Sequence, residues 1–254
     1  MISIITRDIV EYFDTTEFVK IRVGGVPLHP TPPLNYQIVF SPNGLINEYI
    51  EDALVLDSGE IQQIPSLTQL ETIPFPPPFT TMEAFLTSGG CSTLPYTYQN
   101  TIGYLDYKTI RYPGHCAAIK PILDLGFASE NKISIGSTSI TPREVFINLL
   151  EKSLPTNQPD VILMKIISRG IKNKQKQEIE YLMIDYYDKE NKITAMMRTT
   201  AYPASIIAQM ILRGDISQHG VFCNEEIVSP KPFFTELEKR NIEIKKTITT
   251  RSDI

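Results

Sequence analysis

The sequence has few of the residues that mark disulfide-rich folds or metal centres. It contains only three cysteines in 254 residues, widely spaced and without a Cys-x-x-Cys pair, and only three histidines. A sparse, odd cysteine count argues against a disulfide framework and predicts reduced thiols in a cytoplasmic compartment. His115 and Cys116 are adjacent, which is poor geometry for two ligands of one metal ion, so we expect no metal site.

Long apolar runs are also missing. No segment reaches the roughly 18 apolar residues that a membrane-spanning helix needs. Residues 1–13 include acids and lack a small-residue cleavage site, so we expect no secretory signal there. The net charge of −5 gives no sign of a nucleic-acid partner. We therefore expect neither a membrane nor a nucleic acid as a partner.

The glycine-rich sequences that hold phosphate groups do not occur. The chain has no GxGxxG, no GxxxxGK[S/T] and no GxSxG. Gly24 and Gly25 follow a strand-like run, but Pro27 would interrupt a helix N-terminus of the kind that binds pyrophosphate. The sequence therefore predicts no cofactor-binding residues in this chain.

What is present is an ordinary globular composition, 42% hydrophobic and 21% charged, with several strand-like runs. Alternation or β-branched enrichment predicts strands at residues 18–23 (ending at Gly24-Gly25), 36–40, 53–56, 60–64, 104–111, 160–169, 178–187, 192–198 and 242–245. Short polar loops join the three runs between residues 160 and 198, which favours an antiparallel meander.

Capping residues, prolines and terminal glycines predict the helices, at residues 43–50, 81–86, 115–125, 141–153, 203–213 and 232–240. Residues 71–79 are rich in proline and are expected to form an extended loop. Together the elements predict an α+β fold, with a large antiparallel or mixed sheet and helices packed on one face. The uncovered face would suit a partner surface.

One stretch, from Gly89 to His115, gathers the polar groups of a binding site. Lys108 and Arg111 can hold carboxylates, and Gly89 and Gly90 allow close approach of a backbone to a ligand. A helix that begins near His115 would attract anions. The alternative is a structural turn with exposed cations, and these physical considerations leave both open.

The same stretch resembles the C-terminal domain of saccharopine dehydrogenases. The resemblance is carried by TSGGCSTLP at 87–95 and by YLDYKTIRYPGHCAAIKPILDLGF at 104–127, which contains a K-T-[LI]-R-Y-x-G-H pattern. Further blocks look like the lysine 6-dehydrogenase branch of that family, at residues 23–27, 32–50, 83–90, 199–221 and 230–244.

The resemblance implies a division of the chain. Residues 1–22 would be a remnant of the junction to a missing nucleotide-binding domain, and residues 23–200 a substrate-binding and dimerisation domain. Residues 201–254 would form the C-terminal helical segment that packs back on the nucleotide-binding domain in the family. Three origins stay open: a fragment, a split-gene subunit whose partner carries the cofactor domain, or a degraded relative.

The implied activity is hydride transfer between NAD or NADP and a C–N bond of an amino acid, as in lysine 6-dehydrogenase or saccharopine dehydrogenase. This chain would supply the substrate-binding and dimerisation portion and would be inactive alone, because the cofactor domain is missing. The expected partners are a second copy, a separate nucleotide-binding subunit and an amino-acid substrate. The alternative is a non-catalytic, dimer-forming subunit or scaffold.

The resemblance also supplies candidate site residues. The substrate-binding set is Arg111, Lys108, Gly89, Gly90, Thr93, Tyr36 and Asn35. His115 is the candidate for proton transfer, with a helix-cap role as the alternative. Because Lys108 and Arg111 are three apart on a predicted strand, they should face opposite sides, and Arg111 is favoured as the ligand-facing cation. The local supply of two cations favours lysine over a substrate with three carboxylates.

Overall fold

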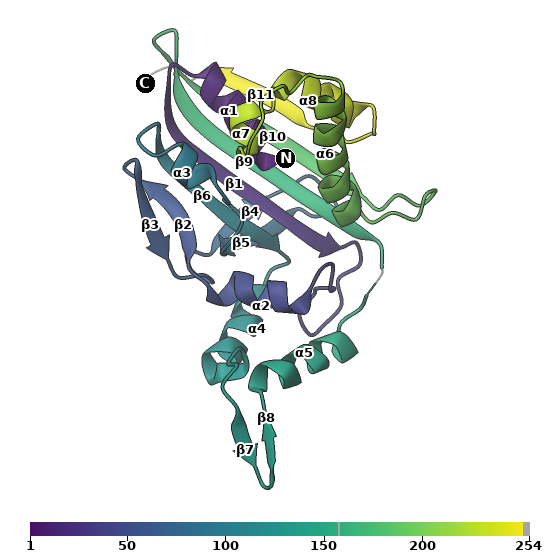
Figure 1. Ribbon diagram of the computed structural model, residues 1–254. Helices are drawn as coiled ribbons and strands as arrows, with labels where there is room; N and C mark the ends of the chain where they lie inside the picture. The colour runs from purple at the N-terminus through teal and green to yellow at the C-terminus, as the bar shows by residue number, and fades with distance from the viewer. Residues whose placement is uncertain (157, 251–254) are drawn as a thin grey trace.

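The computed structural model describes residues 1–156 and 158–250 and is built on one large mixed sheet (Figure 1). The strands follow the order β11-β10-β9-β1-β6-β2-β3, and β5 pairs with β6 while β4 pairs with β5. The strands of this sheet are β1 (Thr15–Pro27), β2 (Ala53–Asp57), β3 (Glu60–Ile64), β4 (Glu71–Pro74), β5 (Thr81–Leu86), β6 (Ile102–Arg111), β9 (Asp160–Lys172), β10 (Gln175–Tyr186) and β11 (Lys245–Thr250). A separate hairpin consists of β7 (Ile133–Ile135) and β8 (Thr138–Ile140).

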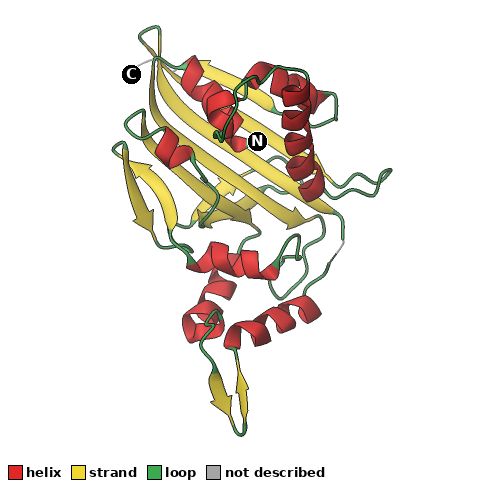
Figure 2. Ribbon diagram, viewed as in Figure 1, coloured by secondary structure: helices red, strands yellow, loops and turns green. Residues whose placement is uncertain are grey.

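The helices form two groups, one on a face of the sheet and one beyond the ends of its central strands (Figure 2). The first group is α1 (Ile2–Tyr12), α6 (Ala195–Leu212), α7 (Asn224–Ile227) and α8 (Pro230–Glu238). The second is α2 (Pro42–Ile50), α4 (His115–Ile122) with a π-helical turn (Leu123–Phe127), and α5 (Pro142–Ser153). A short α3 (Leu94–Thr97) precedes β6.

The predicted α+β fold with a large mixed sheet is confirmed. β1 and β6 are parallel neighbours, whereas β1 with β9 and β9 with β10 are antiparallel. The hairpin at 53–64, the strand at 104–111 and the helices at 43–50 and 141–153 all form near their predicted bounds.

Hydrophobic clusters hold the layers together, and three of them are large. The largest lies between the sheet and the first helix group and includes Ile21, Met164 and Phe233. A second joins α2, α4 and α5 and includes Tyr49. The third lies on the opposite face, where β4, β5 and the segment after β4 cover one end of the central strands. The second face of the sheet is therefore covered in part by the chain itself.

The predicted end of the first strand at Gly24-Gly25 is wrong, because β1 continues to Pro27. Gly24 lies so close to β6 that a Cβ atom there would be 2.2 Å from the carbonyl oxygen of Ile110. The glycine therefore serves close packing of two parallel strands and does not end the first one.

The predictions for residues 71–86 are also corrected. Residues 81–86 form β5 and not a helix, because they pair with β6 on one side and β4 on the other. Residues 71–74 form β4 despite the prolines nearby. Since β4 pairs only with β5, it is an edge strand, where a proline is tolerated because its missing N–H faces away from the sheet.

The strand predicted at 192–198 is a helix from Ala195 onward. Thr194 caps it by accepting a hydrogen bond from the Met197 N–H at 3.1 Å. The buried carboxylate of Asp160, at the start of β9, accepts from the N–H groups of Ala195 at 2.7 Å and Met196 at 2.9 Å. The N-terminus of α6 is therefore capped by an acid from another element. This is a long-range contact, so the local sequence pattern does not reveal it.

Smaller corrections concern the remaining predicted elements. Residues 36–40 form only one isolated bridge, between Ile38 and Thr156. Pro203 lies inside α6 and does not start it, and the last strand lies slightly later than predicted. All three cysteines are free thiols. Within the described ranges, no helix is long and apolar enough to cross a membrane, and no cluster of three or more metal-binding side chains occurs.

Candidate functional site

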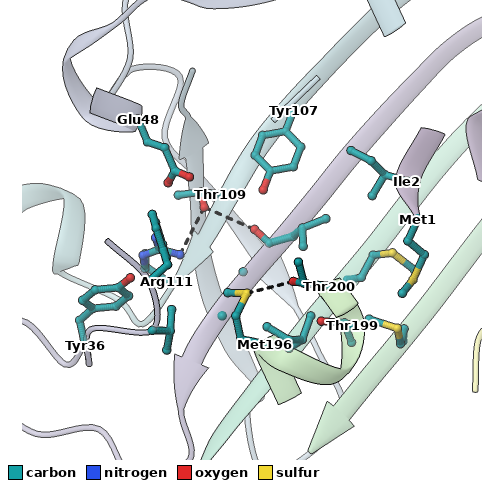
Figure 3. Close-up of a pocket in the computed structure, with 18 residues that line it drawn as sticks. Met1, Ile2, Tyr36, Glu48, Tyr107, Thr109, Arg111, Met196, Thr199 and Thr200 are labelled. Atoms are coloured by element: carbon teal, nitrogen blue, oxygen red, sulfur yellow. Dashed lines mark hydrogen bonds between the residues drawn. The ribbon is translucent and has the colours of Figure 1, made fainter. Parts of the chain in front are cut away.

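A cavity of about 330 Å³ opens where β1 and β6 end, between the sheet, α2 and the start of α6 (Figure 3). Its wall has a polar part, with Arg111, Glu48, Thr109, Tyr36 and Tyr107. The rest is mainly apolar, with four methionines, Met1, Met164, Met183 and Met196, beside Ile2 and Ile162. Figure 3 shows Tyr36, Arg111 and Glu48 on one side and Met1 and Ile2 on the other.

Arg111 is the central polar residue of this wall. Its side chain is only 3% exposed, yet it forms no ion pair with any described residue. Nη1 donates to the Thr109 hydroxyl at 3.2 Å and to the Ile110 carbonyl at 2.9 Å, and the guanidinium lies 4.8 Å from the Tyr36 ring centre. Within residues 1–156 and 158–250, Nη2 has no hydrogen-bond acceptor, so a buried cation is left with capacity for an anion.

A chain of three hydrogen bonds fixes the orientation of Arg111. Its Nε donates to the Tyr49 hydroxyl at 3.0 Å, so that hydroxyl has its own hydrogen free for His115 Nε2, also at 3.0 Å. His115 Nδ1 lies 2.9 Å from the Leu34 carbonyl oxygen, which can only accept. These partners assign the proton of His115 to Nδ1 and leave Nε2 as the acceptor.

His115 is therefore neutral and lies behind the cavity, outside its wall. Burial, together with the positive charge of Arg111, lowers the pKa of His115 to about 3. His115 thus stays unprotonated at neutral pH, and both of its ring nitrogens are hydrogen-bonded to the protein. Such a histidine is suited to positioning Tyr49. Its side chain is not among the groups that line the cavity.

The helix N-terminus at Gly114–His115, expected to attract an anion, already holds one from the protein. The carboxylate of Glu83, on β5, accepts from the N–H groups of Gly114 at 2.8 Å and Cys116 at 2.7 Å. The negative charge at the positive end of α4 thus comes from the protein's own Glu83. Its hydrogen bonds connect β5 to α4.

Lys108 points to the opposite face of β6 from Arg111, as expected from their spacing. Its ammonium group donates to the Glu71 carboxylate at 2.9 Å and the Gln69 carbonyl at 2.7 Å. Arg22 also pairs with Glu71, and its Nη1 binds Asp106 at 2.7 Å. Lys108 therefore belongs to a partly buried ion-pair network and is separated from the cavity by the sheet.

The other predicted residues are divided between the cavity and its surroundings. Tyr36 lines the wall, whereas Asn35 does not. Gly90 packs against the ring of Tyr107, because a Cβ there would lie 2.0 Å from that ring, and Gly89 is exposed with a φ of +76°. Thr93 lies outside the wall, where its hydroxyl donates to Glu225 at 2.6 Å.

The predicted substrate-binding set contains none of Glu48, Thr109, Tyr107 and the methionines, although Thr109 lies in the polar stretch from Gly89 to His115. The alternation along 104–111 contains a signal for two of them, since Tyr107 and Thr109 share a strand face with Arg111. Glu48 comes from α2, and its approach to β6 depends on tertiary packing. Burial raises the pKa of the Glu48 carboxyl, although the charge of Arg111 opposes that effect.

The two glycine pairs of the sequence lie in closely packed surroundings. Gly24 is fixed against β6, and the space beside Gly90 is filled by Tyr107, so neither glycine pair forms an open loop whose N–H groups could surround a pyrophosphate.

Comparisons with known proteins agree with this architecture. The family model described as the saccharopine dehydrogenase C-terminal domain matches residues 1–242. Saccharopine dehydrogenase (L-Glu forming) from Saccharomyces cerevisiae has a similar fold, with a TM-score of 0.74 and 16% identity, covering 98% of this chain and 71% of that one.

Homospermidine synthase from Legionella pneumophila, solved in complex with NAD, is similar at a TM-score of 0.51 and 12% identity. That match covers 97% of this chain but 56% of the synthase, so this chain corresponds to little more than half of it. At such low identities the two structures show a shared fold. The family match over residues 1–242 shows that the chain belongs to the saccharopine dehydrogenase C-terminal domain family.

Proposed function

We propose that this chain supplies the substrate-binding part of a nicotinamide-dependent oxidoreductase that acts on a C–N bond of an amino acid. The observation that carries the proposal is Arg111, a buried guanidinium that faces a cavity without an acid partner. A carboxylate bound there would accept a hydrogen bond from Nη2, in a site where desolvation strengthens the interaction. Family membership supports the reaction class.

In this proposal the protein's contribution is to orient the substrate and exclude water. Tyr49 and His115 hold the guanidinium in place, and Tyr36 stacks against it. NAD or NADP would accept or donate the hydride from a nucleotide-binding domain or subunit. The NAD in the Legionella synthase structure supports this cofactor class.

The number of cations in the wall favours lysine over saccharopine as the substrate. A substrate with three carboxylates requires several cations, and Arg111 is the only cationic side chain among the described residues that line the cavity. The methionine-rich part of the wall offers an apolar surface for an aliphatic chain. We therefore place the protein nearer to a lysine-oxidising function than to a saccharopine-oxidising one.

Substrate binding can be tested on this chain directly. L-Lysine is titrated into the wild type and Arg111→Met, and binding is followed by NMR chemical shifts. We expect Arg111→Met to weaken binding about tenfold or more, since a charge-assisted hydrogen bond contributes about 1.5–3 kcal/mol. Equal binding by two folded proteins would contradict the proposal.

The cofactor arrangement has its own experiment. Isothermal titration of NAD and NADP into the isolated chain should show no micromolar binding, because no phosphate-binding loop is present in the described residues. Micromolar binding of either dinucleotide would refute the assignment of the cofactor to another domain.

A further inference from the structure

Glu48 is the second charged side chain in the wall of the cavity, and the proposed function does not use it. It lies on the last turns of α2, next to Tyr49, and is partly buried. Its carboxylate has no hydrogen bond or ion pair with any described residue. The carboxylate of Glu48 is partly removed from water and has no direct partner in the part of the chain that the structure describes. Its oxygens can therefore accept hydrogen bonds from a ligand.

Glu48 and Arg111 face the same cavity without meeting. They are close enough for each charge to affect the pKa of the other, but they do not form an ion pair. Figure 3 shows both side chains on the same side of the cavity, with Thr109 beside them. A gap between opposite charges in one wall fits a ligand head group that itself carries one positive and one negative charge.

We propose that Glu48 binds the α-ammonium group of the substrate while Arg111 binds its carboxylate, so that the cavity selects a zwitterionic amino-acid head. The inference rests on the proposed function, because it assumes that Arg111 anchors the carboxylate. An ammonium group donates three hydrogen bonds, and the carboxylate of Glu48 accepts them. Thr109 lies between the two anchors and is held by Arg111 and the Val23 carbonyl.

The remainder of the wall sets the character of the side chain that follows this head. Met164, Met183 and Ile162 come from β9 and β10, and the lining residues in the described part of the chain include no charged side chain apart from Arg111 and Glu48. Flexible thioether side chains accommodate an unbranched alkyl chain. The head is therefore recognised by charge and the tail by apolar contact.

Two simple ligands separate the roles of the anchors. L-Norleucine carries the full zwitterionic head on a butyl chain, whereas hexanoate carries the same carboxylate and chain without the ammonium group. Both are titrated by NMR into the wild type, Glu48→Gln and Arg111→Met. Glu144→Gln is the matched control, because Glu144 is an exposed acid on α5 outside the cavity. Circular dichroism checks that each variant is folded.

We expect norleucine to bind the wild type about tenfold more tightly than hexanoate, which is the size of one charge-assisted interaction. Glu48→Gln should remove most of that difference by weakening norleucine alone, and Glu144→Gln should preserve it. Arg111→Met should weaken both ligands.

The possible failures are distinguishable. Equal binding of the two ligands by the wild type, or an equal loss of both in Glu48→Gln, would overturn the role of Glu48 and leave Arg111 as the carboxylate anchor. If Arg111→Met affected neither ligand, or if the wild type bound neither, the proposed function itself would fail.

Discussion

The Tyr49 hydroxyl accepts a hydrogen bond from Arg111 Nε at 3.0 Å. The same hydroxyl is hydrogen-bonded to His115 Nε2, so one oxygen from α2 joins the end of β6 to the start of α4. Through this contact, a residue that does not line the cavity determines how the guanidinium is presented to it.

Tyr49→Phe should weaken both the fold and ligand binding. The substitution leaves the buried Arg111 Nε and His115 Nε2 without a partner, which costs about 1–3 kcal/mol of unfolding free energy. Because Arg111 is then free to move, lysine binding should weaken as well. Tyr98→Phe is the control, since Tyr98 is buried but its hydroxyl has no hydrogen bond to the described residues. Similar urea midpoints and affinities for both variants would contradict this role.

Lys108→Met should lower the stability of the fold and leave ligand binding nearly unchanged. Lys108 loses its contacts with Glu71 and Gln69, and we expect a loss of about 1–3 kcal/mol in unfolding free energy, measured by urea denaturation. Lysine binding should stay within about twofold of the wild type, because the sheet separates Lys108 from the cavity. A loss of affinity as large as that of Arg111→Met would place Lys108 in the binding site.

The sequence predicts the part of the site that depends on a single strand. Alternation along 104–111 is enough to place Arg111 and Lys108 on different sides of that strand, and the structure confirms that they face opposite sides. Glu48 could not be found in this way, because its position depends on packing of α2 against β6. The helix predicted at 81–86 is wrong for a similar reason, since pairing with β4 and β6 overrides the local pattern.

The two glycines of the predicted loop should respond differently to alanine. A Cβ at Gly90 would lie 2.0 Å from the Tyr107 ring, so Gly90→Ala should displace Tyr107 in the cavity wall and weaken lysine binding severalfold. Gly89 has free space around it but a φ of +76°, so Gly89→Ala should cost only about 1 kcal/mol of stability. NMR titration and urea denaturation measure the two effects. Equal affinities for the two variants would show that Tyr107 is not needed in its present position.

We also predict a homodimer formed through the face of β9 and β10 that the helices leave open. That face carries the ion pairs Lys165–Glu180 at 3.9 Å and Arg169–Glu178 at 3.2 Å. Such an alternating charge pattern can match a second copy under two-fold symmetry. Light scattering should give twice the 28.7 kDa chain mass, with dissociation at high salt. A monomer at high protein concentration and low salt would contradict the prediction.

The buried, neutral His115 should make the protein less stable in mild acid. Its pKa is lowered to about 3 from the ordinary 6.5, so between these values the unfolded chain binds a proton that the folded chain does not. The stability contributed by neutral His115 is therefore present above pH 6.5 and is lost as the pH falls. Between pH 7 and pH 5 the loss amounts to about 2 kcal/mol of unfolding free energy. His115→Gln lacks this titration, so urea denaturation should show a wild-type advantage that shrinks by about that amount at pH 5. If the wild type and His115→Gln lost the same unfolding free energy, His115 would take up its proton as readily in the folded chain as in the unfolded one. The hydrogen-bond chain from Arg111 to Leu34 would then need a different proton arrangement.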